Sequence, residues 1–256
     1  MNPPTSFVRR VSMPGLHLAA LLVTAVIAHG ASIGVNFTGG GNGGSLAISL
    51  LPTDLAGVIP QGNYNNVPGG SATNFALNNN LGLTTTALLT FTAGGTYSSV
   101  NATVTPAGGD EKLNAGFVFG SGSFTISNIP FTLYSLYVYE LNDAGGRVET
   151  TTLGGVSFFG ASATPNDAGH IDQNAATPYS YVQSISTNVA SPTVGGDYVL
   201  YSNLTGSSQT FTSAAPGNGY VNGFQIVEAV PEPGSALYGA GLLCLAGLRR
   251  ARRSSR

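Results

Sequence analysis

The residues best suited to chemistry lie in one short polar stretch, DAGHID, at residues 167–172. A histidine near carboxylates could act as the base of a Ser-His-Asp triad. Two features count against this chemistry. The other histidines, His17 and His29, lie near the N-terminus, and no Gly-x-Ser-x-Gly motif follows residue 30. We therefore expect His170 to lie in a solvated loop, and we predict no catalytic residue.

The same stretch offers oxygen atoms of the kind that calcium prefers as ligands. Asp167 and Asp172 are the candidate calcium ligands, with Asn166 and Asn174 beside them, although the spacing differs from that of an EF-hand loop. A single histidine cannot supply a zinc site of several imidazoles. We expect no metal or cofactor, with calcium as the alternative.

Two kinds of residue could serve carbohydrate chemistry. A glycosidase needs two carboxylates about 5 to 9.5 Å apart across a cleft, and residues 31–229 contain ten acidic side chains, none in a recognisable catalytic motif. Tyrosine rings could stack on sugars, although core or strand-surface packing is the simpler explanation. The candidate rings are Tyr64, Tyr97, Tyr179, Tyr198 and Tyr220.

Residues 31–229 are acidic and almost free of positive charge. Lys112 and Arg147 stand against ten acids, so the formal net charge of this span is −8, whereas the whole chain sums to −2. Nucleic-acid phosphates require Lys and Arg, so we expect no nucleic-acid partner. The only cysteine, Cys244, lies outside the span, so the fold must rely on its core and not on disulfides.

The last 27 residues have three parts in a fixed order. An apolar run at 235–248 would form a helix about 21 Å long, shorter than the ~30 Å hydrocarbon core, so we predict a short transmembrane helix. Arginines in the basic tail 249–256 should stop it at the cytoplasmic side. Prolines keep the preceding motif, 230–234, extended. The motif residues are Val230, Pro231, Glu232, Pro233 and Gly234, and the membrane-stop residues are Arg249, Arg250, Arg252 and Arg253.

This tail resembles the PEP-CTERM sorting signal of bacterial surface and exopolysaccharide-associated proteins. The resemblance covers residues 230–256 and implies recognition by an exosortase, a membrane-embedded enzyme resembling a cysteine transpeptidase. It also implies transient anchoring in the inner membrane, followed by transfer to the cell surface or release. The alternative is a short membrane anchor that is never cut.

The N-terminal residues 1–30 have the pattern of a secretory signal peptide. Arg9 and Arg10 supply the positive region, 16–28 supplies an apolar helical region, and Ala28 and Gly30 fit a small-residue cleavage site. An uncleaved N-terminal anchor is the alternative.

Between these ends, short apolar runs alternate with Gly, Pro and Asn turns. This pattern predicts an all-β fold, an antiparallel β-sandwich in one domain over residues 31–229. The turn Asn142–Gly146 predicts a hairpin that pairs 132–141 with 147–153. We expect a charged turn at 108–112 and leave 113–119 open between helix and strand. The other expected strands are 32–37, 46–51, 84–93, 97–105, 123–129, 156–159, 179–187, 197–202, 209–213 and 220–227.

A second, looser resemblance is to secreted bacterial domains with a galactose-binding-like jelly roll. It is carried by 56–66, by the hairpin around 136–147, and by the closing pair 198–204 and 221–227. The resemblance implies that the first and last strands, 33–37 and 224–227, are neighbours. It also implies sugar binding or a spacer role, although a fold alone does not give a function.

These observations predict an exported, non-enzymatic surface or extracellular-matrix protein. Its partners would be the exosortase-like enzyme, the inner membrane before processing, and an extracellular polysaccharide bound by the β-sandwich. A purely structural spacer is the first alternative, and a secreted hydrolase is the second.

Overall fold

The structure is a computed structural model that describes residues 30–41, 46–98, 108–141, 147–161, 180–214 and 220–229. Across these ranges no helix combines the length and apolar character needed to cross a bilayer. The predicted signal peptide helix before residue 30 and the predicted transmembrane helix at 235–248 lie outside the described residues.

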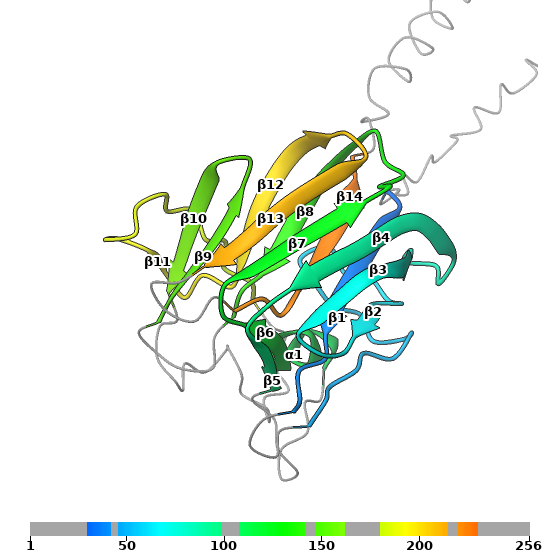
Figure 1. The fold of residues 1–256 in the computed structure, drawn as a ribbon, viewed down its shortest axis with the longest axis horizontal. Coiled ribbons are helices and arrows are strands. Elements are labelled where there is room, and N and C mark those ends of the chain that lie inside the picture. The colour runs from blue at the N-terminus through cyan, green and yellow to red at the C-terminus, as the bar shows by residue number, and fades with distance from the viewer. Residues whose placement is uncertain are drawn as a thin grey trace, which may run out of the picture.

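Two β-sheets make up most of the described fold (Figure 1). The five-stranded sheet has the order β12 (Tyr198–Thr205), β8 (Leu133–Tyr139), β14 (Gly223–Glu228), β1 (Ser32–Phe37) and β2 (Asn65–Val67). The seven-stranded sheet has the order β11 (Thr193–Val194), β10 (Val156–Ala161), β9 (Val148–Leu153), β13 (Ser208–Ala214), β7 (Gly122–Ser127), β4 (Thr84–Thr92) and β3 (Ser71–Asn78). Most neighbouring pairs are antiparallel, and the predicted all-β sandwich is confirmed at this level.

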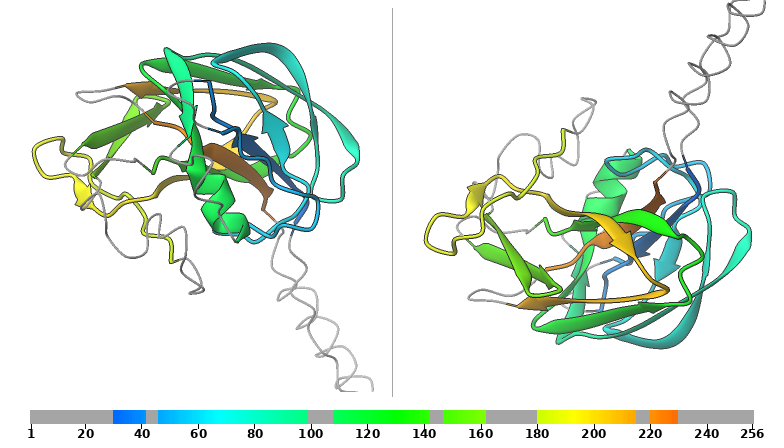
Figure 2. Two further views of the ribbon diagram at one scale, coloured as in Figure 1. Left: turned by 90° about the horizontal axis from the view of Figure 1, so that it is seen from below. Right: turned by 90° about the horizontal axis from the view of Figure 1, so that it is seen from above.

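A two-stranded sheet and one short helix complete the elements in the described ranges. The small sheet pairs β5 (Gly95–Ser98) with β6 (Gly116–Phe119), and helix α1 (Gly109–Ala115) leads directly into β6. Leu113 of α1 packs with Tyr139 of β8, so the helix lies on the five-stranded sheet, on the side away from the seven-stranded sheet (Figure 2).

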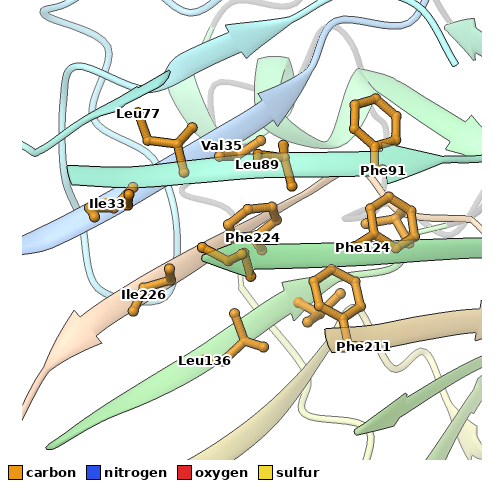
Figure 3. Packing of buried hydrophobic residues seen from close by; sticks show 14 of the residues in the cluster. Ile33, Val35, Leu77, Leu89, Phe91, Phe124, Leu136, Phe211, Phe224 and Ile226 are labelled. Atoms are coloured by element: carbon orange, nitrogen blue, oxygen red, sulfur yellow. The ribbon is translucent and has the colours of Figure 1, made fainter. Parts of the chain in front are cut away.

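The core lies between the two sheets and is built from alternating positions of each strand. Ile33, Val35 and Phe37 point inward from β1 and are fully buried. Opposite them, Phe91, Phe124 and Phe211 form a line of rings across β4, β7 and β13 (Figure 3). Neighbouring rings in this line are nearly parallel, with centroids 5.6 Å and 4.7 Å apart. The period-2 pattern therefore fixes which face of each strand is buried.

The first and last strands of the sandwich are neighbours, as the jelly-roll resemblance implied. β1 and β14 pair antiparallel, with Ser32 opposite Val227 and Asn36 opposite Gly223. Beyond the paired strands, the Ala31 amide donates to the Glu228 carboxylate at 3.3 Å. The two ends of the described fold thus leave it side by side.

The predicted hairpin between 132–141 and 147–153 is wrong. β8 lies in the five-stranded sheet between β12 and β14, whereas β9 lies in the seven-stranded sheet between β10 and β13. Polar turn residues occur both in hairpins and in connections between the sheets of a sandwich, so they do not distinguish the two. The two closing segments form β12 and β14 of the same sheet, with β8 between them.

Two further predicted strands, 46–51 and 179–187, are wrong for a common reason. In each segment a side chain takes part of the backbone hydrogen bonding that a neighbouring strand would otherwise supply. Asn66 accepts from the Leu50 amide and donates to the Leu50 carbonyl, both at 2.9 Å. In the second segment, of which 180–187 is described, Asp197 accepts from the Val182 amide at 2.9 Å. Both segments therefore lack regular strand structure. In the second segment, isolated bridges form at Gln183 and Ser186.

Other boundaries shift for local reasons. The predicted charged turn at 108–112 is mostly the start of α1, where the Glu111 carboxylate accepts from the Gly108 amide at 3.0 Å. The ambiguous 113–119 contains both the end of that helix and β6. β3 was not predicted, and of the strand predicted at 97–105 only 97–98 lies in the described ranges, as part of β5.

Candidate functional site

Two buried tyrosines and one half-buried tyrosine gather on the outer face of the five-stranded sheet, beneath the covering segment 46–64. Tyr139 projects from β8, Tyr64 from the covering segment and Tyr181 from the segment before β11. The ring centroids of Tyr139 and Tyr181 are 5.4 Å apart. Asp110, in the first turn of α1, completes this tyrosine cluster.

Hydrogen bonds within the tyrosine cluster connect the covering segment to the sheet. The Tyr181 hydroxyl and the Gly57 amide both donate to Asp110 Oδ1 at 2.7 Å. The Tyr139 hydroxyl donates to Gln225 Oε1 and accepts from the Val58 amide. These hydrogen bonds satisfy the polar groups of the cluster, which is typical of a structural network.

Burial governs the protonation of the tyrosine cluster. It raises the pKa of Tyr64 and Tyr139 well above the ordinary phenol value. Burial also raises the pKa of Asp110, although the Tyr181 hydroxyl and the Gly57 amide oppose the shift. The tyrosines are therefore neutral near pH 7 and have no character as bases or nucleophiles.

The candidate sugar-stacking tyrosines divide into two groups. Tyr64 and Tyr220 are buried, and Tyr220 packs edge-on against Phe117 at 4.6 Å, so neither offers a free ring face. Tyr97 and Tyr198 are partly exposed, and Tyr179 lies outside the described residues.

Three acidic side chains, Glu140, Glu149 and Asp197, are almost fully buried. Thr151 donates to Glu140 at 2.8 Å, and the Tyr220 amide donates to Glu149 at 2.9 Å. Burial raises the pKa of Glu140 to about 8, with smaller contributions from the charges of Glu149 and Asp197. A glycosidase pair must face its substrate, and the burial of these carboxyls does not fit that role.

Within the described ranges, no three His, Cys, Asp or Glu side chains converge as a metal site would require. The candidate calcium ligands Asp167 and Asp172, together with His170, lie outside those ranges, so the calcium alternative stays a prediction. The sorting motif Val230–Gly234 and the membrane-stop arginines lie outside them as well, because Ala229 is the last described residue.

Threonine and serine side chains form an ordered array on the outer face of the seven-stranded sheet, which we call the hydroxyl face. One row crosses six strands in register, each residue directly opposite the next. A second, shorter row joins Thr90, Thr125 and Thr210. The six-residue row consists of Ser71, Thr92, Ser123, Thr212, Thr152 and Ser157.

The sequence reasoning missed the hydroxyl face, although a signal was present. The tripeptides Thr90-Phe-Thr92, Ser123-Phe-Thr125 and Thr210-Phe-Thr212 repeat one pattern, a phenylalanine between two hydroxyl residues. Each tripeptide predicts a strand with Phe inward and hydroxyls outward. Their alignment across three adjacent strands depends on register, which the sequence does not show.

Comparison of the chain with protein-family models, with curated proteins and with solved structures found no match. Its function must therefore be inferred from its own residues and geometry.

Proposed function

We propose that this chain is an exported bacterial surface or extracellular-matrix protein whose C-terminal tail is processed by an exosortase-like enzyme. The sequence supports this through the signal-peptide pattern of 1–30 and the three-part tail of 230–256. In the proposal Pro231, Glu232 and Pro233 are recognised as substrate, and the arginines after 248 hold the tail in the inner membrane until cleavage.

The pairing of β1 with β14 is the observation that carries this proposal. β1 begins at Ser32, just after the predicted signal-peptide cleavage site, and β14 ends at Glu228, just before the sorting motif. The first and last strands of the sandwich therefore pair within the span that would remain after signal-peptide cleavage and tail cleavage. Neither cleavage would remove a strand of the described sheets.

For the sandwich itself we propose a jelly-roll-like domain that associates with carbohydrate and carries out no catalysis. The neutral hydroxyl face and the burial of Glu140, Glu149 and Asp197 favour binding over hydrolysis. A structural spacer without a ligand is the second candidate, favoured by the low charge of 31–229.

The sorting proposal is tested by the intact mass of the protein recovered from each cell fraction. We expect a mass that ends near Val230–Gly234 outside the inner membrane. Glu232→Ala should leave the full-length form in the membrane, because the recognised motif is lost, whereas Ser235→Ala serves as a neighbouring control. A wild-type mass that still includes Arg256, or unchanged processing of Glu232→Ala, would contradict the proposal.

A further inference from the structure

We propose that the hydroxyl face is a binding surface for an extended, neutral polysaccharide. This inference rests on the proposed carbohydrate association and assigns it a surface and a ligand class. It does not depend on how the C-terminal tail is processed.

The size of the hydroxyl face suits a polymer better than a single sugar. Neighbouring strands lie about 4.8 Å apart, so the row from Ser71 to Ser157 spans roughly 24 Å. Residues two apart on one strand, such as Thr210 and Thr212, repeat about every 6.8 Å on the same face. The result is a regular grid of hydroxyls over several strands, along which repeated units of a chain can make repeated contacts.

The hydroxyl face is uncharged within a domain that is acidic as a whole. Among β3, β4, β7, β9, β10, β11 and β13, Glu149 is the one ionisable residue, and it is buried on the inner side. Protein surfaces usually mix charges of both signs. A face without charge does not attract phosphates or acidic polymers. When a neutral partner binds to it, no charged group has to lose its hydration.

The hydroxyls of this face keep unused hydrogen-bonding capacity. Each hydroxyl has one donor and two acceptor positions. Thr125 and Thr210 share one bond of 2.9 Å, and Thr152 and Ser157 share one of 2.8 Å. The hydroxyls of a polyol can both donate to and accept from the remaining hydrogen-bonding positions. Threonine methyl groups between the hydroxyls can contact the apolar faces of sugar rings.

A second copy of the chain is a poorer occupant. Two such faces stacked together would bury short hydroxyl side chains against each other, and each hydroxyl left without a partner would cost free energy. A polysaccharide avoids this because it brings its own donors and acceptors along the whole row.

The inner side of the sheet holds the hydroxyl face in place. Phe91, Phe124 and Phe211 lie in line beneath its centre, each between two hydroxyl residues of its own strand (Figure 3). Packed rings fix the three strands relative to one another. The hydroxyls above them are therefore held at fixed spacing before any ligand arrives.

The test measures depletion of the full-length protein from solution by insoluble cellulose, a neutral extended glucan, and by alginate gel, an anionic one. We expect retention on cellulose and none on alginate. Thr92→Lys/Thr212→Lys places two charges in the six-residue row at exposed positions, so the fold should survive. Its affinity for cellulose should fall at least about tenfold, because bonds from two hydroxyls are lost.

The matched control is Thr53→Lys/Thr205→Lys, whose exposed threonines lie in the covering segment and at the end of β12. It should bind cellulose like the wild type. Thr92→Val/Thr212→Val keeps the shape and removes only the hydroxyls, and it should also bind more weakly. Thermal unfolding of each variant confirms that it is folded.

Three results would overturn the inference. If the wild type is retained on neither polymer, the carbohydrate association fails together with its surface. If both lysine variants bind cellulose equally, the association stands and the hydroxyl face is the wrong surface. If the wild type self-associates and only Thr92→Lys/Thr212→Lys abolishes this, the face joins copies of the chain. None of these results alters the mass expected after tail processing.

Discussion

Single carboxyl groups in this protein are placed in opposite electrostatic environments. Burial holds the pKa of Glu140 at about 8, far above the ordinary 4.5 of a glutamic acid. For Asp54, burial is the largest single influence and raises the pKa, but the hydrogen bond from Lys112, 2.7 Å away, the Leu51 amide and the Lys112 charge together outweigh it and lower the pKa. The two groups should therefore affect stability in opposite directions as pH changes.

Glu140→Gln should reduce the loss of stability that occurs as pH rises from about 4.5 to 8. Between about pH 4.5 and 8 the folded state keeps a proton on Glu140 that the unfolded state releases. The stability that this proton confers is complete below that range and falls as pH rises, by at most about 1.4 kcal/mol per pH unit. Urea unfolding at a series of pH values should show a flatter profile for the variant and a higher stability at pH 8.

Asp54→Asn provides the contrast of opposite sign. Because the pKa of Asp54 is lowered, its contribution is present at neutral pH and disappears as pH falls through that pKa. This variant should lose about 1 kcal/mol or less at pH 7, since the pair with Lys112 is partly exposed. For Glu140, a steeper loss of stability between about pH 4.5 and 8 in Glu140→Gln than in the wild type would contradict the assignment of a raised pKa.

At the scale of elements, the covering segment 46–64 depends on small and amide side chains along β1. Gly34 faces this segment, and a Cβ there would meet the Gln61 amide and lie 2.7 Å from the Tyr64 ring. Asn36 donates to the Ile48 carbonyl at 2.9 Å. Both faces of β1 are consequently buried, the inner by apolar packing and the outer by the segment.

Gly34→Ala should destabilise the protein by about 1 to 3 kcal/mol, because the added methyl displaces Tyr64 and Gln61 from the sheet. The measurement is the urea midpoint of the full-length protein. Gly70→Ala is the control, since its nearest neighbours would lie at ordinary contact distance, 3.4 Å or more. Equal midpoints for the two variants would show that the segment is loosely held.

The sequence predicted several strands at or near their observed bounds, and two of its errors fall where side chains take part of the backbone hydrogen bonding. β1 was predicted at its observed bounds, and β4 to within one residue, because period-2 alternation reports an inward face directly. The runs at 46–51 and around 182 also contain apolar residues, but the Asn66 side chain binds both backbone groups of Leu50, and the Asp197 side chain binds the Val182 amide. Sequence alone cannot reveal those distant partners.

The candidate site shows the same limit at longer range. The outward threonines of β4, β7 and β13 were readable strand by strand, but the hydroxyl face exists only because three hydroxyl-Phe-Thr tripeptides align in register. The sheet change between β8 and β9 was equally unreadable, since strand pairing depends on the whole sandwich.

At the scale of the whole molecule, the sandwich is complete between Ser32 and Glu228. A chain that ends after Ala229 should unfold at the same urea concentration as the full-length protein, because every strand of the described core is retained. A chain that ends after Asn222 lacks β14, which pairs with both β1 and β8, and should not fold. Circular dichroism and urea unfolding of the two truncations provide the comparison. Loss of folding in the longer one would show that the tail contributes to the core.

The pairing of the first strand with the last also sets when the protein can fold. One edge of β1 can pair only after β14, which lies almost two hundred residues later in the chain, has been synthesised. Contacts this distant in sequence form late and slowly. Until nearly all of the described span has been synthesised, the sandwich cannot close. Completion of this span is thus the trigger for folding.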